Sequence, residues 1–347
     1  MKSSKRFEPR NILVIDFGQL GDVILSLPAL RAIRQRFPDA RITVAVGKSG
    51  AAVVDLSGYA NATLPVDRVG LRDGSKVLSL VRIAKLVKDV RRSKYDFVID
   101  LHSLAETNML GFFSGAETRL FARRPGRSLD YLGNFSPPPP VYNNDPDRHL
   151  VDRYLDVLVP LGVKDSPRVP ALEPRPGDNA LVEEMLRKEK ANAGALMLGL
   201  YVGAGHPSRR WPLARFAELA EWFARNDEVR TIVFTGPEEH RMLKEIRSSF
   251  PRSALLFDGL SIPTLAAAMA RLSVLVANDT GPMHLAAAVR TATVVLSDKS
   301  APNCFLPLGD HHHVLRTHVI EALPVEEVYD VTRALLASGR TAALFAS

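Results

Sequence analysis

The sequence has a single cysteine and no long apolar run, and each shortage excludes a class of protein. Cys304 is alone among 347 residues, so neither an intrachain disulfide nor a cysteine-based metal site can form. No apolar stretch approaches the ~18 residues that a membrane-spanning helix needs. The N-terminal residues lead straight into NILVID, which is too short for the hydrophobic region of a signal peptide. These features predict a cytoplasmic protein.

The charge is basic, with 45 lysines and arginines against 38 aspartates and glutamates and a net charge of +7. Such an excess favours nucleic acid, an anionic membrane surface or phosphorylated small molecules as partners. The sequence has no basic helix with interleaved aromatic residues and no zinc-ligand spacing, which argues against nucleic acid. Phosphate-rich substrates or a lipid surface remain.

The chain is longer than a single core of ~100–200 residues, which predicts two domains. In the first half, strand-length apolar runs alternate with helical patterns, and such alternation indicates βαβ units around a doubly wound parallel sheet. The runs ILVID and FVID lack polar alternation, as do strands that are buried on both faces. The successive segments cover residues 11–16, 22–37, 41–46, 75–92 and 96–100.

The alternation stops between residues 122 and 148, where four consecutive prolines, residues 137–140, predict an exposed loop. Prolines among charged residues between 163 and 178 are typical of an interdomain linker. The alternation then restarts, which predicts a second doubly wound sheet. The segments of this half cover residues 196–202, 213–225, 230–235, 238–250, 254–257, 263–270, 273–277, 283–289 and 293–296. Ligands of such sheets bind at the carboxyl ends of the strands, and a cleft between two such domains is the natural substrate site.

The first motif, Gly18-Gln19-Leu20-Gly21-Asp22, follows the strand ILVID and opens a helix. It is not the GxGxxG loop that an NAD-dependent oxidoreductase needs, which argues against that class. Gly18 and Gly21 allow the backbone to approach a ligand closely. A carboxylate at the carboxyl end of a strand could act as a general base, which makes Asp22 a candidate catalytic residue. Capping of the helix explains the same carboxylate.

Two further loops in the second half join a strand to a helix. The loop GAGHPSRRWP over residues 203–212 carries glycines, Ser208 and two arginines, a combination that suits a diphosphate; a solvated basic loop is the alternative. In the second loop, TGPEEH, Glu238 and Glu239 stand just past a strand, where a carboxylate can accept both hydroxyls of a ribose. Helix capping explains these two glutamates as well.

The sharpest motif is ANDTGPMHLAAA, which begins at Ala277 directly after a predicted strand. Asp279 and Thr280 precede a helix, and Gly281 makes the turn into it. Free amides at a helix start favour phosphate, and a carboxylate can accept from two sugar hydroxyls. Capping accounts for one of these residues but not for the whole group. On the same helix, His284 is either a catalyst or a buried hydrogen-bonding residue.

Three consecutive histidines, His311-His312-His313, could indicate a metal site. Adjacent side chains point in different directions, however, and no matched carboxylate cluster accompanies them. We therefore predict a surface loop here.

Three stretches in this order resemble the lipopolysaccharide heptosyltransferases of glycosyltransferase family nine: GQLGDVILSLPALRAIRQRFPDARITVAVG, the RRWP loop and GLSIPTLAAAMARLSVLVANDTGPMHLAAAV. The resemblance covers roughly residues 11–296. It implies an α/β protein of the GT-B fold, with two doubly wound, Rossmann-like domains facing a cleft. We expect an acceptor-binding domain over residues 1–170 and a nucleotide-sugar-binding domain over 177–347. A final helix over 325–338 could pack back on the N-terminal domain.

The resemblance also implies roles for single residues. Asp22 corresponds to the base that removes a proton from the acceptor hydroxyl, which attacks the anomeric carbon with inversion. Arg209 stands where relatives commonly have a lysine that contacts phosphate and sugar. Arginine keeps the charge but is a planar fork. The implied donor-binding residues are Ser208, Arg209, Glu238, Glu239, Leu260, Asp279, Thr280, Gly281 and His284.

The resemblance also implies which of these residues bind each part of the nucleotide sugar. Asp279 holds the heptose hydroxyls, and Thr280 and Gly281 contact the diphosphate. The ribose is bound by Glu238 or Glu239, with Glu239 preferred. Leu260 falls where relatives place backbone contacts to adenine.

On the acceptor side, an N-terminal cluster of arginines flanks the irregular segment. Its members are Arg119, Arg123, Arg124, Arg127 and Arg148. These arginines could bind a phosphorylated, anionic glycolipid, or they could belong to a solvated loop without a ligand. The predicted acceptor-binding residues are Gly18, Gly21, Arg123, Arg124 and Arg127.

The sequence therefore predicts an inverting glycosyltransferase that moves a heptose from ADP-heptose to a hydroxyl of a lipopolysaccharide core acceptor. The resemblance implies neither a metal nor a cofactor. The expected partners are a nucleotide sugar, an anionic glycolipid and, peripherally, the cytoplasmic face of the inner membrane. Two alternatives stay open: a GT-B enzyme with another nucleotide-sugar donor, and a non-catalytic protein that binds nucleotide sugar.

Overall fold

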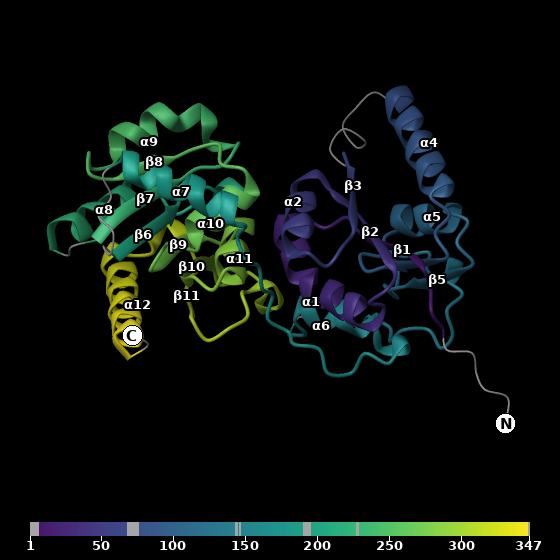
Figure 1. Cartoon of the computed structure of the whole chain (residues 1–347). Helices are drawn as coiled ribbons and strands as arrows, with labels where there is room; N and C mark the ends of the chain where they lie inside the picture. Colours follow the sequence, from purple (N-terminus) through teal and green to yellow (C-terminus); the bar gives the residue numbers. More distant parts are fainter. Residues whose placement is uncertain are drawn as a thin grey trace. The chain divides into compact units, whose positions relative to one another are not determined.

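The computed structural model describes residues 7–67, 76–142, 145, 147–189, 196–226 and 229–345. The chain forms two compact units (Figure 1), the first over Met1–Pro170 with Asn303–Phe305 and the second over Ala171–Pro302 with Leu306–Ser347. The predicted linker covers residues 163–178; residues 163–175 form neither helix nor strand, but a helix begins at Pro176, inside the predicted range. Residue 75 of a predicted helix and residues 143, 144 and 146 of the predicted loop lie outside the described residues.

The first unit contains a parallel sheet with the strand order β3-β2-β1-β4-β5. Its strands are β1 (Asn11–Asp16), β2 (Arg41–Gly47), β3 (Ala62–Val66), β4 (Phe97–Asp100) and β5 (Thr118–Phe121). Its helices are α1 (Leu20–Arg36), α2 (Lys48–Ser57), α4 (Lys76–Arg92), α5 (Ala105–Phe113), α6 (Leu150–Asp156) and the short 3-10 turns η1 (Asp130–Leu132) and η2 (Val159–Leu161). The central strand β1 is fully buried from Ile12 to Ile15, as its uninterrupted apolar run predicts.

The second unit contains a parallel sheet with the order β11-β10-β9-β6-β7-β8. Its strands are β6 (Leu196–Tyr201), β7 (Val229–Phe234), β8 (Leu255–Phe257), β9 (Val274–Asn278), β10 (Ala292–Asp298) and β11 (His312–Thr317). Its helices are α7 (Pro176–Lys188), α8 (Leu213–Asn226), α9 (Leu243–Ser249), α10 (Ile262–Met269), α11 (Gly281–Ala288) and α12 (Val325–Phe345). The 3-10 turns are η3 (Pro207–Arg209), η4 (Glu239–Met242), η5 (Asn303–Phe305, assigned to the first unit) and η6 (Ile320–Ala322). Two doubly wound parallel sheets confirm the predicted α/β fold class.

Each sheet reverses its strand order once, and this reversal positions the candidate sites. In the first unit the chain winds outward from β1 in one direction and from β4 in the other. In the second unit the same change of direction falls between β6 and β9. Ligands of doubly wound sheets bind at the carboxyl ends of the strands beside such a reversal. The loops after β1 and β4, and those after β6 and β9, are therefore where ligands are expected.

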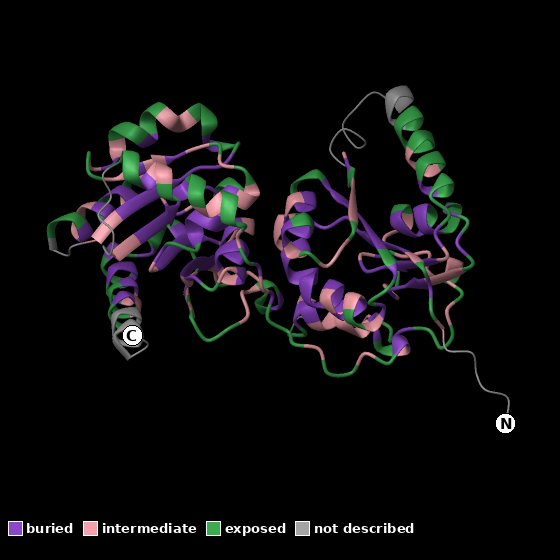
Figure 2. Ribbon diagram, in the orientation of Figure 1, coloured by how far each residue is buried: buried purple, intermediate pink, exposed green. Residues whose placement is uncertain are grey.

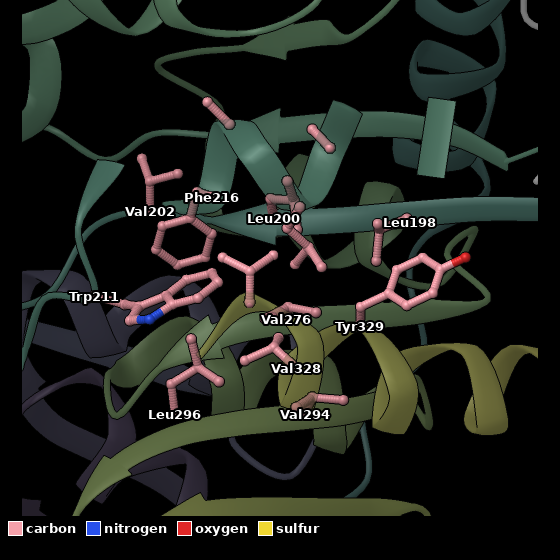
Figure 3. Packing of buried hydrophobic residues seen from close by; sticks show 14 of the residues in the cluster. Leu198, Leu200, Val202, Trp211, Phe216, Val276, Val294, Leu296, Val328 and Tyr329 are labelled. Atoms are coloured by element: carbon pink, nitrogen blue, oxygen red, sulfur yellow. The ribbon is translucent and has the colours of Figure 1, made fainter. Parts of the chain in front are cut away.

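The core of the second unit lies between its sheet and the helices α8 and α12 (Figure 3). Trp211 is almost fully buried there and packs edge-to-face on Phe216, while its indole N–H donates to the carbonyl oxygen of Leu323 at 3.0 Å. The bond anchors the end of the loop after β6 against the segment that precedes α12. Burial of an indole with its N–H satisfied stabilises the fold by several kcal/mol, on the order of what truncation of a buried tryptophan costs.

One expectation about the C-terminal part of the chain is corrected. Val325, Val328 and Tyr329 of α12 lie in the core of the second unit, and a contact of this helix with the first unit stays a prediction. The histidine run is not a loop, because His312 and His313 begin the edge strand β11, which pairs with β10. Three histidines show no β pattern, but the VLRT that follows them supplies β-branched and apolar residues. Among the described residues, no helix has the length and apolar character of a membrane span.

Candidate active site

In the first unit, the loop after β1 is shaped by two carboxylates on either side of Gly18. The amide of Gly18 donates to Asp16 Oδ1 at 3.0 Å, and the amide of Gln19 donates to Asp22 Oδ2 at 2.9 Å. A Cβ atom on Gly18 would lie 2.4 Å from the Cβ of Asp22, so only glycine fits between them. Gly21 is the second residue of α1. The capping role considered for Asp22 is thus present, and its half-exposed carboxylate stands beside the reversal of strand order.

Asp16 is a buried residue of this site that the sequence reasoning did not single out. It ends β1, and its Oδ1 lies 3.6 Å from Nδ1 of His102, which follows β4. Burial by itself would raise the pKa of Asp16, but hydrogen bonding and charge from His102, with the Gly18 amide, hold that pKa below its ordinary value. Among the described residues, Asp16 Oδ2 has no hydrogen-bond partner. The buried anion therefore fixes the loop that carries Asp22.

A second buried carboxylate, Asp100, ends β4 beside β1. It accepts hydrogen bonds from the Ser103 amide at 2.7 Å and from Asn108 Nδ2 at 2.8 Å. Burial raises the pKa of Asp100 to about 6, against the lowering effect of these hydrogen bonds. Ser103 has a positive φ of 49°, in the left-handed region, and its Oγ donates to the Ala122 carbonyl. Hydrogen bonds thus connect Asp100, Ser103 and the residue after β5, Ala122.

The five arginines of the predicted acceptor cluster do not share one environment. Three of them make contacts within the first unit. Arg119 donates to the carbonyls of Leu132 and Ala116. Arg123 pairs with Asp130, and Arg148 pairs with Asp156. Arg124 instead donates to the His102 carbonyl at 2.8 Å, and burial lowers its pKa while the charges of Asp100 and Asp22 raise it. Arg127 is exposed and lies near enough to Arg124 to interact with it electrostatically. Of the five, Arg124 is therefore the one that interacts with the charge of Asp22, and Arg127 is its neighbour.

In the second unit, Asn278 connects the two loops at the reversal of strand order. Its Nδ2 donates to the carbonyls of Val202 and Gly203, at 3.2 and 3.1 Å, and its Oδ1 accepts from the Trp211 amide at 2.9 Å. This buried amide ties both ends of the loop after β6 to the last residue of β9. A single asparagine in the motif ANDTG gave no signal of this role in the sequence.

The two glutamates considered for ribose binding differ in burial. Glu238 is largely exposed and accepts from Arg210 Nη2 at 3.2 Å. Glu239 is buried, accepts from the Gly236 amide at 3.1 Å, and packs so tightly on Gly203 that a Cβ there would lie 2.5 Å from its Oε2. Burial is the main reason that the pKa of Glu239 is raised. Arg210 Nη2 lies 3.4 Å from Glu239 Oε1, an ion pair, although that oxygen accepts no hydrogen bond in the described part of the chain.

Asp279, Ser208 and Arg209 come together around a cavity of about 300 Å³. Arg209 Nη1 lies 3.9 Å from Asp279 Oδ2. Burial raises the pKa of Asp279, and the charges of Arg209 and Arg316 oppose that rise. The cavity is also lined by Leu296, Asp298, Ser300, Ala301 and Pro302. The structure thus joins residues of the GAGHPSRRWP loop and of the motif ANDTGPMHLAAA in one pocket.

The residues after Asp279 lead into α11. Thr280 is the N-cap residue in an extended conformation, and its side chain makes no capping hydrogen bond. Gly281 and Pro282 form the first turn, as the sequence predicts. His284 lies one turn further and is buried, which fits the interpretation of a buried histidine on the helix. The amino end of α11 therefore faces the loop that carries Asp279.

Two further polar groups of the second unit, one beside this pocket and one past β8, were not found from the sequence. Arg316 of β11 donates to the Ala301 carbonyl at 3.1 Å, and its buried Nη2 has no partner among the described residues. Asp258, just past β8, accepts from Thr235 Oγ1 at 2.7 Å and lies 3.2 Å from His240 Nδ1. Leu260 follows this aspartate and is half-buried. The runs ILVID and FVID each end on an aspartate, and this position at the end of a strand could have pointed to Asp16 and Asp100. Arg316 belongs to β11, a strand that the sequence did not predict.

Among the residues that the structure describes, no three side chains of histidine, cysteine, aspartate or glutamate gather as ligands of a metal ion. Cys304 is buried, and burial raises the pKa of its thiol.

Comparison with known proteins adds an independent line of evidence. The model of glycosyltransferase family 9 (heptosyltransferase) matches residues 83–330. Lipopolysaccharide heptosyltransferase 2 of Salmonella typhimurium is 25% identical over 318 residues, which cover 88% of this chain and 87% of the relative. A family 9 glycosyltransferase structure from Veillonella parvula superposes with a TM-score of 0.82 at 24% identity and covers 96% of this chain and 99% of that one. An Escherichia coli heptosyltransferase with ADP-2-deoxy-2-fluoro heptose superposes with a TM-score of 0.72 at 19% identity, over 93% and 99% of the two chains.

Proposed function

The chain belongs to glycosyltransferase family 9, and from this membership we propose that it transfers a heptose from ADP-heptose to a hydroxyl of a lipopolysaccharide core acceptor. The relative from Salmonella typhimurium is a lipopolysaccharide heptosyltransferase, and the Escherichia coli structure holds an ADP-linked fluoro-heptose. The relative supports heptose as the transferred sugar, and the ligand of the Escherichia coli structure supports ADP as the nucleotide.

One observation supports the donor site more than any other, namely the pocket in which Arg209 and Asp279 meet at the amino end of α11. The free amides at a helix start and a guanidinium both bind phosphate oxygens. The carboxylate of Asp279 accepts hydrogen bonds from sugar hydroxyls. In a nucleotide sugar, the diphosphate can bind the helix amides and the guanidinium, and the sugar hydroxyls can bind the carboxylate. We assign Thr280, Gly281, Ser208 and Arg209 to the diphosphate, and Asp279 to the heptose.

The nucleoside part of the donor is assigned to the carboxyl ends of β7 and β8. Arg210 forms ion pairs with both glutamates, so this pairing does not distinguish them. Burial does: Glu239 is buried, and its Oε1 accepts no hydrogen bond among the described residues, so a ribose hydroxyl can donate to it. Glu238 is largely exposed, and Glu239 is therefore the preferred ribose ligand. Leu260 belongs to the segment that we assign to adenine.

Asp22 is assigned as the general base. Its carboxylate takes the proton of the acceptor hydroxyl while the hydroxyl oxygen forms a bond to the anomeric carbon. The bond between that carbon and the diphosphate oxygen breaks, and ADP leaves with the electron pair. Attack opposite the leaving group inverts the configuration of the anomeric carbon. Asp16 and His102 act through the loop and hold Asp22 in place.

For the acceptor we assign Arg124 and Arg127 to anionic groups of the glycolipid, with Gly18 and Gly21 allowing close approach to the backbone. Arg123 belongs to the same segment, but its pairing with Asp130 gives it a smaller part. A lipid-anchored acceptor requires that the enzyme works at a membrane surface, so we also assign a peripheral contact with the membrane.

A titration across nucleotide sugars tests this function. The purified protein is titrated with ADP-heptose, ADP-glucose, UDP-glucose and GDP-mannose, and each donor is then incubated with a lipid A precursor that carries Kdo. We expect ADP-heptose to bind most tightly and to be the donor whose sugar appears on the acceptor. Equal or tighter binding of a UDP or GDP sugar would favour the alternative of another donor. Tight binding of ADP-heptose without any transfer would favour a non-catalytic protein.

A further inference from the structure

The cavity around Arg209 and Asp279 has a second side to which the donor assignment gives no role. This side lies on β10 and on the chain that follows it, with Leu296, Asp298, Ser300, Ala301 and Pro302. All of these residues belong to the second unit, as do Ser208, Arg209 and Asp279. The diphosphate and the hydroxyls beside Asp279 account for one side of the cavity, so the segment over residues 298–302 is available to another part of the donor.

The strand order places Asp298 further from the phosphate-binding loop than Asp279. β6, β9 and β10 are successive neighbours in the sheet. Their carboxyl ends lead to the loop with Arg209, to Asp279 and to Asp298, respectively. Each step from one strand to the next moves about 4.8 Å along this edge. A sugar that starts at the diphosphate and passes Asp279 therefore reaches Asp298 next.

The sheet becomes accessible at Asp298. Figure 2 shows the interior of this sheet as buried. β9 is buried over its whole length and β10 over residues 293–297, whereas Asp298, the last residue of β10, is partly exposed. Asp279 lies directly against β10, because its amide donates to the Leu296 carbonyl at 3.1 Å. The carboxylates of Asp279 and Asp298 thus line one cavity from neighbouring strands.

Hydrogen bonds hold the segment after β10 in place. The Ser300 amide donates to Asp298 Oδ1 at 2.6 Å, and the Ala301 amide donates to the Asp298 carbonyl at 3.1 Å. Arg316 Nη1 donates to the Ala301 carbonyl, also at 3.1 Å. Hydrogen bonding by Ser300 is the main reason that the pKa of Asp298 is lowered, so this side chain is an anion at neutral pH. A carboxylate has about four acceptor positions, so Asp298 can accept further hydrogen bonds beside those from Ser300.

A heptose differs from a hexose at the exocyclic end of the sugar. A hexose has a single exocyclic hydroxyl, on C6, whereas a heptose has hydroxyls on the two neighbouring carbons C6 and C7. A carboxylate can accept from both hydroxyls of such a diol, because it has two oxygens. Two carboxylates in one cavity therefore suit a sugar that has hydroxyls on its ring and a diol beyond the ring.

We propose that Asp298 binds the C6 and C7 hydroxyls of the heptose and thereby makes the donor site prefer a heptose to a hexose. This role rests on the proposed function, since it takes ADP-heptose as the donor. Asp279 keeps the ring hydroxyls, which lie nearer to the diphosphate. Arg316 is a positioning residue that holds the segment through the Ala301 carbonyl. A hexose donor leaves one of the hydrogen bonds to Asp298 unmade.

Calorimetric titration with ADP-heptose, ADP-mannose and ADP tests this role. ADP-mannose carries the ring hydroxyls of a manno-heptose but lacks its seventh carbon. We expect the wild type to bind ADP-heptose at least about tenfold more tightly than ADP-mannose, as for loss of a hydrogen bond to a charged group. In Asp298→Ala this preference should fall to about twofold or less, while the affinity for ADP stays within about twofold of the wild-type value.

Two further variants separate recognition from folding. Asp298→Asn keeps the segment in place, because its amide oxygen can still accept from the Ser300 amide. It loses the charge and one acceptor oxygen, so the preference for heptose should fall here too, to about threefold. Asp330 of α12 is an exposed aspartate of the same unit, and Asp330→Ala should leave all three affinities unchanged.

Two results would overturn the role of Asp298. One is a wild-type preference for heptose in both Asp298 variants. The other is an equal loss of affinity for ADP, ADP-mannose and ADP-heptose, which would mean that Asp298 only supports the fold of the pocket.

Transfer assays separate this role from the proposed function. Each ADP sugar is incubated with the protein and a lipid A precursor that carries Kdo. If the wild type transfers heptose but both Asp298 variants keep its preference, the role of Asp298 is wrong and the function stands. If the wild type transfers no sugar but binds ADP-heptose with a preference that Asp298→Ala removes, the transfer is wrong and the role of Asp298 stands. Equal binding of ADP-heptose and ADP-mannose by the wild type would contradict the role of Asp298 directly.

Discussion

Arg209 lies with its Nη1 atom 3.9 Å from Oδ2 of Asp279, just before the N-terminus of α11. The distance leaves the pair loosely held, and the arginine is more than half exposed. A ligand with a diphosphate for the guanidinium and hydroxyls for the carboxylate would occupy both groups at once. Substitutions of these two residues can therefore distinguish binding of the diphosphate from binding of the sugar.

Asp279→Ala should weaken ADP-heptose binding about tenfold more than it weakens ADP binding, because the carboxylate is assigned to the sugar hydroxyls. ADP should bind nearly as well as before, since Arg209 and Arg316 keep their charge near the phosphates. The ratio of the two dissociation constants, measured by calorimetry, is the quantity to compare. A loss of equal size for ADP and ADP-heptose would show that Asp279 does not hold the sugar.

Gly203→Ala should lower the affinity for ADP at least about tenfold, because overpacking at this position displaces a neighbouring side chain. The added Cβ would lie 2.5 Å from Glu239 Oε2, so the assigned ribose ligand has to move. Gly205→Ala is the matched control, since a Cβ there meets nothing within 4 Å. The two variants are compared in the same ADP titration. Equal affinities for both variants would mean that Glu239 does not contribute to nucleotide binding.

Asp100 should give the first unit a pH-dependent stability. Its pKa is raised to about 6 by burial, so protonation stabilises the folded state. The stabilisation is complete below the unfolded pKa, ~4, and disappears as the pH rises through ~6, a difference on the order of 2–3 kcal/mol. Asp100→Asn cannot titrate. Urea unfolding should therefore show the variant gaining stability relative to wild type as the pH rises from about 4 to about 7. A constant difference across that range would contradict the raised pKa.

Arg124→Gln should raise the acceptor KM roughly tenfold and leave the donor KM unchanged, as expected for loss of a charged hydrogen bond to the acceptor. Arg127→Gln should act in the same direction with a smaller effect, because this side chain is exposed and more strongly screened. Arg148→Gln is the control, since Arg148 is paired with Asp156. Steady-state kinetics at low and high salt provide the test. An acceptor KM that responds equally to all three substitutions would remove the special position of Arg124.

Much of the fold follows from local patterns in the sequence. The strand predicted over residues 11–16 coincides with β1, and the strand predicted over 41–46 is one residue shorter than β2. Both could be predicted because buried parallel strands give continuous apolar runs between turn residues. The motif at Asp279 was placed correctly at the start of a helix, since Gly-Pro marks such a turn. These features depend on neighbouring residues alone.

The parts of the site that the sequence did not reveal depend on contacts between distant segments. His102 meets Asp16 only because β4 pairs with β1, and Arg316 approaches Asp279 only because β11 pairs with β10. The division of the arginine cluster was hidden for the same reason, since Arg123 and Arg124 are adjacent in sequence but find different partners. Spacing in a sequence predicts neighbours on one element, whereas the pairing of strands decides which elements meet.

The most direct test of the account is transfer by Asp22→Asn. The amide oxygen of asparagine can still accept the hydrogen bond from the Gln19 amide, so the cap of α1 is kept while the base is lost. Single-turnover formation of the heptosylated acceptor from ADP-heptose is followed by mass spectrometry, with ADP-heptose affinity measured on the same samples. We predict unchanged affinity and a rate that is lower by roughly 10²–10⁴. A variant that transfers heptose at the wild-type rate would contradict the assignment of Asp22 as the catalytic base.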